Sequence, residues 1–314
     1  MPDAVLLLAH GTPDSVDEIP DYLSRVTGGR PLPQTVVDEV KHRFAAIGGS
    51  PLTRLTLEQG RLLQEELHLP VYVGMRNWKP YIADVVHQIR TDGITRAVVI
   101  CLAPQNSRTS VGLYRRAVFA AAENAIDLCF LSDWADQPSL IAAFAERLRS
   151  VRDPLLAEVG PPVPVLFTAH SVPCRTIITP APAAAGAPTE PPDPYPVEAK
   201  QTARLVAESA GLAPQDWLFA FQSQGMSGGP WLGPTVEDTL ATLRQQGILN
   251  LVLQPIGFLC DHVEILYDID VAFHTLAGSL GMHLRRPASL NDSPLLTQAL
   301  ADLARKALAR PDAG

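Results

Sequence analysis

Long apolar runs are missing from this 314-residue sequence. No stretch approaches the roughly 18 apolar residues that a membrane-spanning helix needs, so we expect no integral membrane segment. The apolar run over residues 4–9 is too short for a secretory signal and has no basic residues before it. These absences favour a soluble, cytoplasmic protein.

Positive charge is also scarce. The chain has 25 Lys and Arg against 33 Asp and Glu, a formal net charge of −8. Nucleic-acid binding needs a basic face, so we expect no nucleic-acid partner. The four cysteines lie far apart and form no CxxC pair. Cys101, Cys129 and Cys260 sit in apolar segments, which favours buried free thiols.

Short apolar runs alternate with amphipathic stretches along the chain, which predicts an α/β fold with parallel sheets. Most runs are continuous in Val, Ile and Leu, as in strands that are covered on both faces. The expected strands are residues 4–9, 71–75, 96–102, 127–131, 163–169, 217–221, 249–256 and 281–285. The expected helices are residues 16–26, 35–47, 53–67, 81–92, 109–124, 138–152, 195–210, 235–246, 262–276 and 292–309.

A hinge is expected over residues 153–162, which divides the chain into lobes 1–152 and 153–314 with about four strands each. The final helix, 292–309, is free to pack back on the first lobe. Residues 179–196 are dominated by Pro and Ala, which suit neither a helix nor a central strand. We expect a surface loop there.

Chemically useful side chains follow several expected strands. Open α/β sheets bind ligands beyond the carboxyl ends of their strands. His10 follows the first strand, His170 follows the fifth, and Glu264 comes shortly after the seventh. Two plainer interpretations stay open: Asp261 and Glu264 could form a capping box, and His170 could be a packed histidine that holds a turn.

The order of several short segments resembles ferrochelatases, from about residue 4 to the final helix. The most specific part is AHSVP at 169–173 together with CDHVEILYD at 260–268, flanked by PWLGP at 230–234. The other segments, in chain order, are LAHGTP, AIGGSPL, GMRNWKP, LAPQNS, SVGLY, DPYP and FQSQG.

The resemblance implies two similar Rossmann-like lobes, each a four-stranded parallel sheet flanked by helices, with a porphyrin cleft between them. It implies that His170 and Glu264 are the catalytic and metal-binding pair. Iron insertion exchanges two pyrrole protons for one Fe²⁺, and a neutral imidazole can accept a proton or bind the metal. Which of these His170 does stays open. His10, on the opposite lobe, could bind the metal from the other face of the ring or only brace the turn at Gly11.

Matching positions in relatives suggest porphyrin-binding residues, listed here by number: Arg30, Ser50, Arg76, Asn77, Tyr114 and Trp231. The SVGLY segment and the missing membrane segment resemble soluble bacterial enzymes that act on coproporphyrin III. Fe²⁺ is then a substrate, and we expect a monomer. Some relatives hold an iron–sulfur cluster on cysteines near the C-terminus, but no cysteine follows Cys260, so we expect no cluster here.

Three alternatives remain at this level. The substrate could be protoporphyrin IX. The chain could instead be a sirohydrochlorin cobalto- or ferrochelatase, since LLLAHGT suits that group too, although those enzymes use a pair of histidines. A two-lobed protein that binds haem or iron without catalysis is the alternative from another class.

Overall fold

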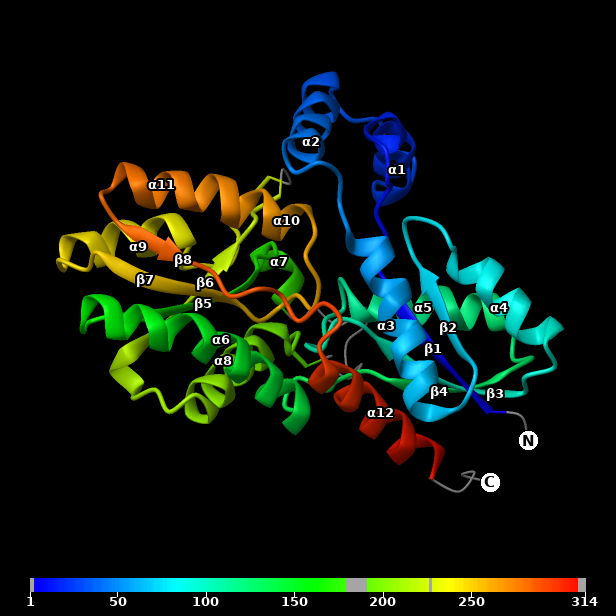
Figure 1. Ribbon diagram of the computed structural model, residues 1–314. Helices are drawn as coiled ribbons and strands as arrows, with labels where there is room; N and C mark the ends of the chain where they lie inside the picture. Colours follow the sequence, from blue (N-terminus) through cyan, green and yellow to red (C-terminus); the bar gives the residue numbers. More distant parts are fainter. Residues whose placement is uncertain (1–2, 179–190, 226–227, 310–314) are drawn as a thin grey trace, which may run out of the picture.

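Two four-stranded parallel sheets form the centre of the molecule in the computed structural model (Figure 1), which describes residues 3–178, 191–225 and 228–309. The first sheet has the order β2-β1-β3-β4, and the second has the matching order β6-β5-β7-β8. Their strands are β1 (Asp3–Ala9), β2 (Val71–Met75), β3 (Arg96–Cys101), β4 (Asp127–Leu131), β5 (Val165–His170), β6 (Trp217–Gln222), β7 (Asn250–Pro255) and β8 (His283–Arg285). The expected fold class, two similar α/β lobes, is confirmed.

The helices lie between the strands in sequence. In the first half they are η1 (Val16–Glu18), α1 (Ile19–Val26), α2 (Gln34–Ala46), α3 (Leu52–Leu67), α4 (Ile82–Thr91) and α5 (Val111–Ala122). In the second half they are α6 (Pro138–Val159), α7 (Cys174–Ile177), α8 (Tyr195–Ser209), η2 (Pro214–Asp216), α9 (Val236–Gln245), α10 (Val263–Leu266), η3 (Asp268–Phe273), α11 (His274–Ser279) and α12 (Pro294–Leu308). Of the expected loop 179–196, residues 179–190 lie outside the described part.

Strand β1 shows why apolar runs become central strands here. Leu6 and Leu8 face one side of the sheet and join a cluster with α4 and α5. Val5 and Leu7 face the other side and join a larger cluster that includes α3, α6 and α12. None of these four leucine and valine side chains is exposed to solvent. Both faces of the sheet are therefore covered, as parallel sheets require.

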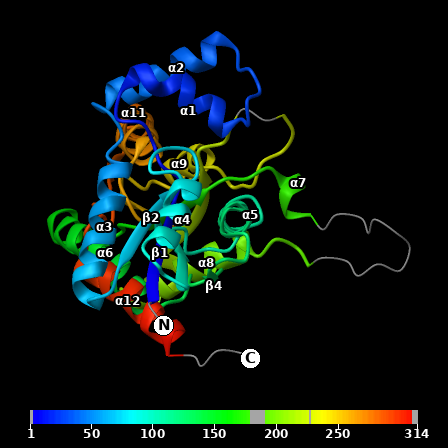
Figure 2. The same ribbon diagram turned by 90° about the vertical axis from the view of Figure 1, so that its right-hand side faces the viewer.

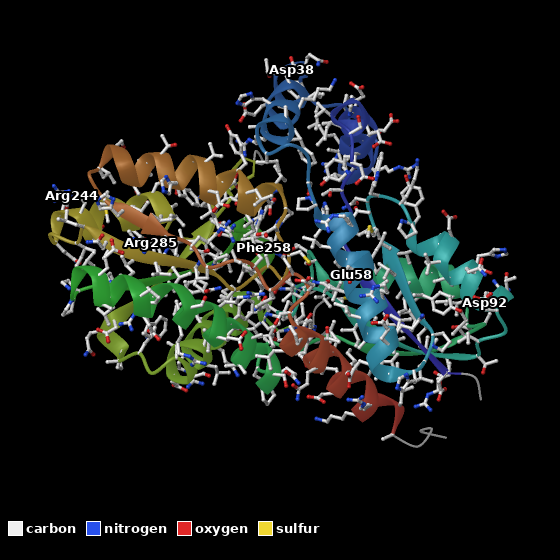
Figure 3. All side chains as sticks on the ribbon, viewed as in Figure 1. Asp38, Glu58, Asp92, Arg244, Phe258 and Arg285 are labelled. Atoms are coloured by element: carbon white, nitrogen blue, oxygen red, sulfur yellow. The ribbon has the colours of Figure 1, made fainter. Side chains whose placement is uncertain are left out.

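The larger hydrophobic cluster is continuous between the lobes. It contains Val5 of the first sheet, Phe167 of the second, and Leu300 of α12. Helix α12 packs against both α3 and α6. Figure 3 shows Phe258 near the middle of the molecule, whereas Asp38, Asp92 and Arg244 lie at its outer ends. The two sheets thus share one core.

The expected hinge over residues 153–162 differs from the structure, because α6 continues to Val159. Pro154 lies inside this helix. Proline removes one backbone donor, but Pro154 is exposed, so the carbonyl that loses its partner can bind water. The lobe limits at residues 152 and 153 stay a prediction.

Helices α1 and α2 project together from one side of the molecule and reach across to the second lobe (Figures 1 and 2). Arg43 of α2 lies 3.2 Å from the Asp268 carboxylate of η3. Val263 packs against the small cluster that contains Tyr22 and Phe44. These contacts fix α1 and α2 above the space between the sheets.

The single helix expected over residues 262–276 is divided in the structure into α10, the π-helical η3 and α11. The Ala272 amide donates to the Tyr267 carbonyl five residues earlier at 2.9 Å, which widens the turn. Within the described ranges, no helix has the length and apolar character needed to cross a bilayer.

Candidate active site

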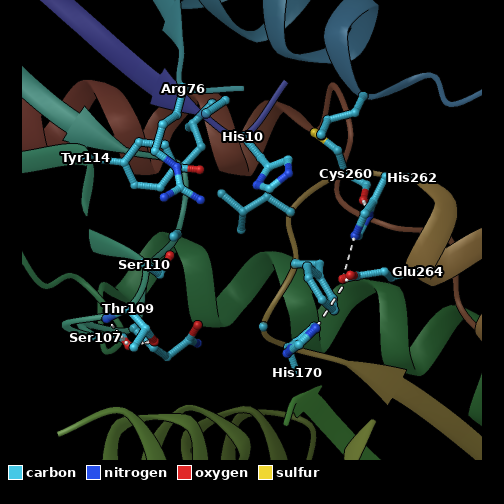
Figure 4. A pocket seen from close by; sticks show the side chains of 18 of the residues that line it. His10, Arg76, Ser107, Thr109, Ser110, Tyr114, His170, Cys260, His262 and Glu264 are labelled. Atoms are coloured by element: carbon cyan, nitrogen blue, oxygen red, sulfur yellow. Dashed lines mark hydrogen bonds and ion pairs between the residues drawn. The ribbon is translucent and has the colours of Figure 1, made fainter. Parts of the chain in front are cut away.

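A cavity of about 380 Å³ lies between the carboxyl ends of the two sheets. Residues from both lobes line it (Figure 4). The first lobe contributes the end of β1, residue 76, and the loop that follows β3. The second lobe contributes the end of β5 and the segment 257–264. The strand ends therefore meet at one cavity, as the sequence predicted from parallel sheets.

His170 is the last residue of β5 and faces the cavity. Its Nδ1 is bonded to the Ser171 carbonyl, which fixes the ring orientation. Its Nε2 lies 3.5 Å from Oε1 of Glu264. Because Nδ1 faces a carbonyl, it carries a proton, and Nε2 is the nitrogen available for proton or metal exchange.

Glu264 lies in the first turn of α10, and its carboxylate faces the cavity. The capping-box interpretation is wrong, because the N-cap is His262 and no side chain caps this helix. Asp261 instead accepts hydrogen bonds from Ser289 and Asn291. The carboxylate of Glu264 is therefore free of helix capping.

His262, which the sequence analysis did not predict as a site residue, also contacts the Glu264 carboxylate. Its Nε2 lies 3.5 Å from Oε2 of Glu264, and its Nδ1 donates to the Cys260 carbonyl at 3.0 Å. Residues two apart on a helix do not face each other. His262 precedes the helix in an extended conformation, φ −162° and ψ −176°, in which residues two apart share a face. The contact between His262 and Glu264 therefore depends on the extended backbone at His262, which the sequence pattern does not show.

The charges of His170 and Glu264 stabilise each other. Burial by itself lowers the pKa of His170, but the charge of Glu264 and the hydrogen bonds of the ring outweigh it and raise the pKa above 6.5. Burial alone would raise the pKa of Glu264, yet the charges and hydrogen bonds of His170 and His262 hold it well below its usual range. The pair therefore favours the protonated imidazole beside the carboxylate, and a metal cation can compete with that proton.

His10 faces the cavity from the first lobe, opposite His170 and Glu264 (Figure 4). Its Nε2 shares a hydrogen bond of 2.8 Å with the Tyr22 hydroxyl. The amide nitrogen of Asn77 lies within 3.2 Å of both ring nitrogens. Burial, helped by the charge of Arg76, lowers the pKa of His10 to about 4. His10 is thus a neutral imidazole at physiological pH, with a lone pair that a metal can use.

Three of the expected porphyrin-binding residues, Arg76, Tyr114 and Trp231, line the cavity. The Arg76 guanidinium lies over the Tyr114 ring, 5.4 Å from its centroid, and its buried Nε has no hydrogen-bond partner among the described residues. A cation of this kind can receive a carboxylate.

The other three expected residues do not line the cavity. Ser50 is buried behind it and accepts a hydrogen bond from Thr12, which does line it. Asn77 contacts His10 instead. Arg30 is exposed and donates to the Thr27 carbonyl at 3.1 Å. The sequence places Arg30 between α1 and α2, and within the described residues its guanidinium is hydrogen-bonded to its own loop, an arrangement that local sequence cannot predict.

Metal binding by protein side chains alone is limited in the described part of the chain, where no group of three or more His, Cys, Asp or Glu residues can hold a metal ion. The arrangement that exists is a pair, His170 with Glu264, facing one imidazole across a cavity. A planar ligand whose own nitrogens bind a metal would complete such a site, since it would bring most of the ligands itself.

The family model described as ferrochelatase matches residues 2–308 of the chain. A ferrochelatase of Acidobacterium capsulatum is 69% identical over 310 residues, which cover 98% of this chain and 95% of that relative. A ferrochelatase of Deinococcus radiodurans is 39% identical, with 96% and 95% covered. A coproporphyrin III ferrochelatase of Geobacillus thermodenitrificans is 33% identical, with 98% and 96% covered.

Solved structures share the fold at low sequence identity. The sirohydrochlorin chelatase SirB of Bacillus subtilis subspecies spizizenii, in complex with cobalt, superposes with a TM-score of 0.59 at 11% identity and covers 99% of this chain and 97% of that one. CbiX, described as the terminal enzyme of sirohaem biosynthesis in denitrifying bacteria, has a TM-score of 0.52 at 13% identity, with 98% and 100% covered. These likenesses support the two-lobed chelatase architecture.

Proposed function

The chain belongs to the ferrochelatase family, and we propose that its porphyrin substrate is coproporphyrin III, with Fe²⁺ as the metal substrate. The observation that carries the site assignment is the cavity with His170 and Glu264 on one side and His10 on the other. Insertion of Fe²⁺ releases two pyrrole protons, so groups that exchange protons and bind a cation must lie beside the ring centre.

His170 and Glu264 are proposed to handle the metal and the protons. In either role His170 must first be neutral, so any proton on Nε2 passes to solvent as Fe²⁺ competes for the same imidazole and carboxylate. Glu264 then balances the charge, whether Nε2 of His170 binds iron or accepts a pyrrole proton. Support comes from the 3.5 Å separation of Nε2 and Oε1. His262 orients the same carboxylate from its other oxygen.

His10 is proposed as a ligand of the iron from the opposite face of the ring. Its neutral imidazole supports this, because a protonated ring has no lone pair to offer a metal. The alternative, that His10 only braces the turn at Gly11, predicts no coordination.

The choice of coproporphyrin III rests on carboxylate recognition. This porphyrin carries four propionates, and protoporphyrin IX carries two. Arg76 and the hydroxyl-bearing residues Ser107, Thr109 and Ser110 line the cavity and suit carboxylates. We also propose that the bound porphyrin contacts Arg30, Ser50 and Asn77, as the resemblance suggests. No iron–sulfur cluster is proposed, because no cysteine follows Cys260.

Anaerobic insertion of Fe²⁺, assayed side by side with coproporphyrin III, protoporphyrin IX and sirohydrochlorin, tests the substrate. A higher kcat/KM for coproporphyrin III is expected, and a preference for either of the other two overturns the proposal.

His170→Ala separates the two roles of the histidine. Lost turnover with intact Fe²⁺ binding indicates the proton role, and lost binding indicates the ligand role.

A further inference from the structure

Asp193 is a fully buried carboxylate outside the site described above. It precedes α8 in the second half of the chain, yet it contacts the loop after β3 of the first lobe. Its Oδ2 accepts a hydrogen bond from the Arg108 amide at 2.8 Å and lies 3.5 Å from the Ser107 hydroxyl. Its side chain has no exposed surface. A buried charge is costly unless it is well paired, so these contacts must hold the loop firmly.

The other oxygen of the same carboxylate leads to His170. Oδ1 of Asp193 accepts a hydrogen bond from the Tyr195 amide at 3.0 Å. The Tyr195 hydroxyl in turn donates to the His170 carbonyl at 2.8 Å. Tyr195 itself is buried and lines the cavity. Two sets of hydrogen bonds, joined through the residue Tyr195 itself, therefore connect the 107–110 loop of the first lobe to the strand end that bears His170.

We propose that Asp193 and Tyr195 are positioning residues that hold His170 in register with the 107–110 loop of the opposite lobe. This inference rests on the proposed role of His170 in iron insertion. A porphyrin in the cavity contacts residues of both lobes, so the imidazole and the loop must keep a fixed separation. Asp193 holds the loop through one oxygen and Tyr195 through the other, and Tyr195 passes this constraint to the His170 backbone.

Glu198 provides a matched control within the same helix. Its carboxylate accepts a hydrogen bond from the Asn106 amide at 2.6 Å, so it anchors the same loop. The charges of Asp133, Asp136 and Asp193 also act on this carboxylate, whereas His170 is linked through Tyr195 instead. Loop anchoring and histidine positioning can therefore be separated by comparing Glu198→Gln with Asp193→Asn and Tyr195→Phe.

The experiment measures kcat and the porphyrin KM for iron insertion, with porphyrin binding followed by fluorescence. Tyr195→Phe keeps the ring that lines the cavity and removes only the hydroxyl bonded to the His170 carbonyl, so it is expected to lower kcat about tenfold with KM unchanged. Asp193→Asn is expected to lower kcat and raise KM. The double variant should have the kcat of Asp193→Asn, since both residues act in one chain. Glu198→Gln should raise KM and keep kcat.

An unchanged kcat in Tyr195→Phe overturns the inference, and so does a kcat loss in Glu198→Gln equal to that of Asp193→Asn. A double variant whose loss of kcat equals the product of the two single losses would also overturn the inference. Thermal unfolding of each variant checks folding, and Tyr195→Phe decides alone if Asp193→Asn does not fold. His170→Ala is run alongside: full activity there refutes the proposed role of His170, whereas an inactive His170→Ala with an unaffected Tyr195→Phe refutes positioning only.

Discussion

At the scale of single residues, the ion pair of His170 and Glu264 makes the reaction sensitive to pH. The pKa of His170 is raised in the folded protein, so its neutral form predominates only above that raised value. Both proposed roles need the neutral form. We therefore expect the rate of iron insertion to rise with pH through a midpoint above 6.5, and initial rates across the range from about pH 5 to 9 measure it.

Glu264→Gln tests the origin of that midpoint. Burial lowers the pKa of His170, and the substitution removes the charge that most opposes it, so that only the Ser171 carbonyl and the charge of Asp268 still raise the pKa. The midpoint should move to lower pH, and the maximal rate should fall by about 10- to 100-fold. Glu65→Gln, which changes an exposed carboxylate, is the control and should leave the profile in place. A midpoint that stays fixed in Glu264→Gln contradicts the assignment.

Tyr22 decides how easily His10 reaches a metal, because its hydroxyl is bonded to Nε2 of that ring. In Tyr22→Phe this nitrogen loses the hydroxyl and keeps the Asn77 amide as its protein partner, so we expect stronger axial coordination of the bound iron porphyrin. In His10→Ala the coordination should disappear. Absorption and resonance Raman spectra of the iron porphyrin complexes report the axial ligand. Identical spectra for wild type and His10→Ala would leave His10 only the role of a brace.

At the scale of elements, α12 stabilises the junction of the lobes. Leu300 is fully buried in the cluster shared by the two sheets. Leu300→Ala should lower the free energy of unfolding by about 2–5 kcal/mol through lost burial and a cavity. Leu303, which is only partly buried in the same helix, is the control and should lose less. Urea unfolding followed by circular dichroism measures both, and equal losses would show that α12 contributes no special packing.

Elements with one strong pattern were predictable from the sequence, and elements shaped by tertiary contacts were not. The strand expected over 127–131 matches the bounds of β4, a half-buried strand at the edge of its sheet, because a run this short is typical of a strand. The expected helix 262–276 was divided, since the wide turn after Tyr267 leaves no mark in the apolar pattern. The four-residue helix α7 was missed, because so short a helix has no period to detect.

At the scale of the whole molecule, the continuous core makes the two lobes one folding unit. The cluster that contains Val5 also contains Phe167 and Val252 of the other sheet. We expect a single unfolding transition, with coincident midpoints for tryptophan fluorescence and circular dichroism. The four tryptophans lie in both halves of the sequence, so they report on both lobes. Two separated transitions would contradict a shared core.

The candidate site was predictable to the extent that it follows from strand ends. His10, His170 and Glu264 lie far apart in sequence and face one cavity, because parallel strands deliver their carboxyl ends to one edge. Tyr22 was not predictable as a cavity residue, since it arrives from a projecting helix. Tyr195 lies in a recognised segment, DPYP, but its contact with the His170 carbonyl exists only in three dimensions.

The matching strand order of the two sheets places the two opposed histidines at equivalent positions. His10 directly follows β1, and His170 ends β5; these are the leading strands of their sheets and occupy the same place in each order. Both histidines come after an alanine. Equivalent strands thus bring one imidazole to each side of the same cavity. The surroundings then make the two rings different, since His170 faces the Glu264 carboxylate and His10 faces the Tyr22 hydroxyl and the Asn77 amide.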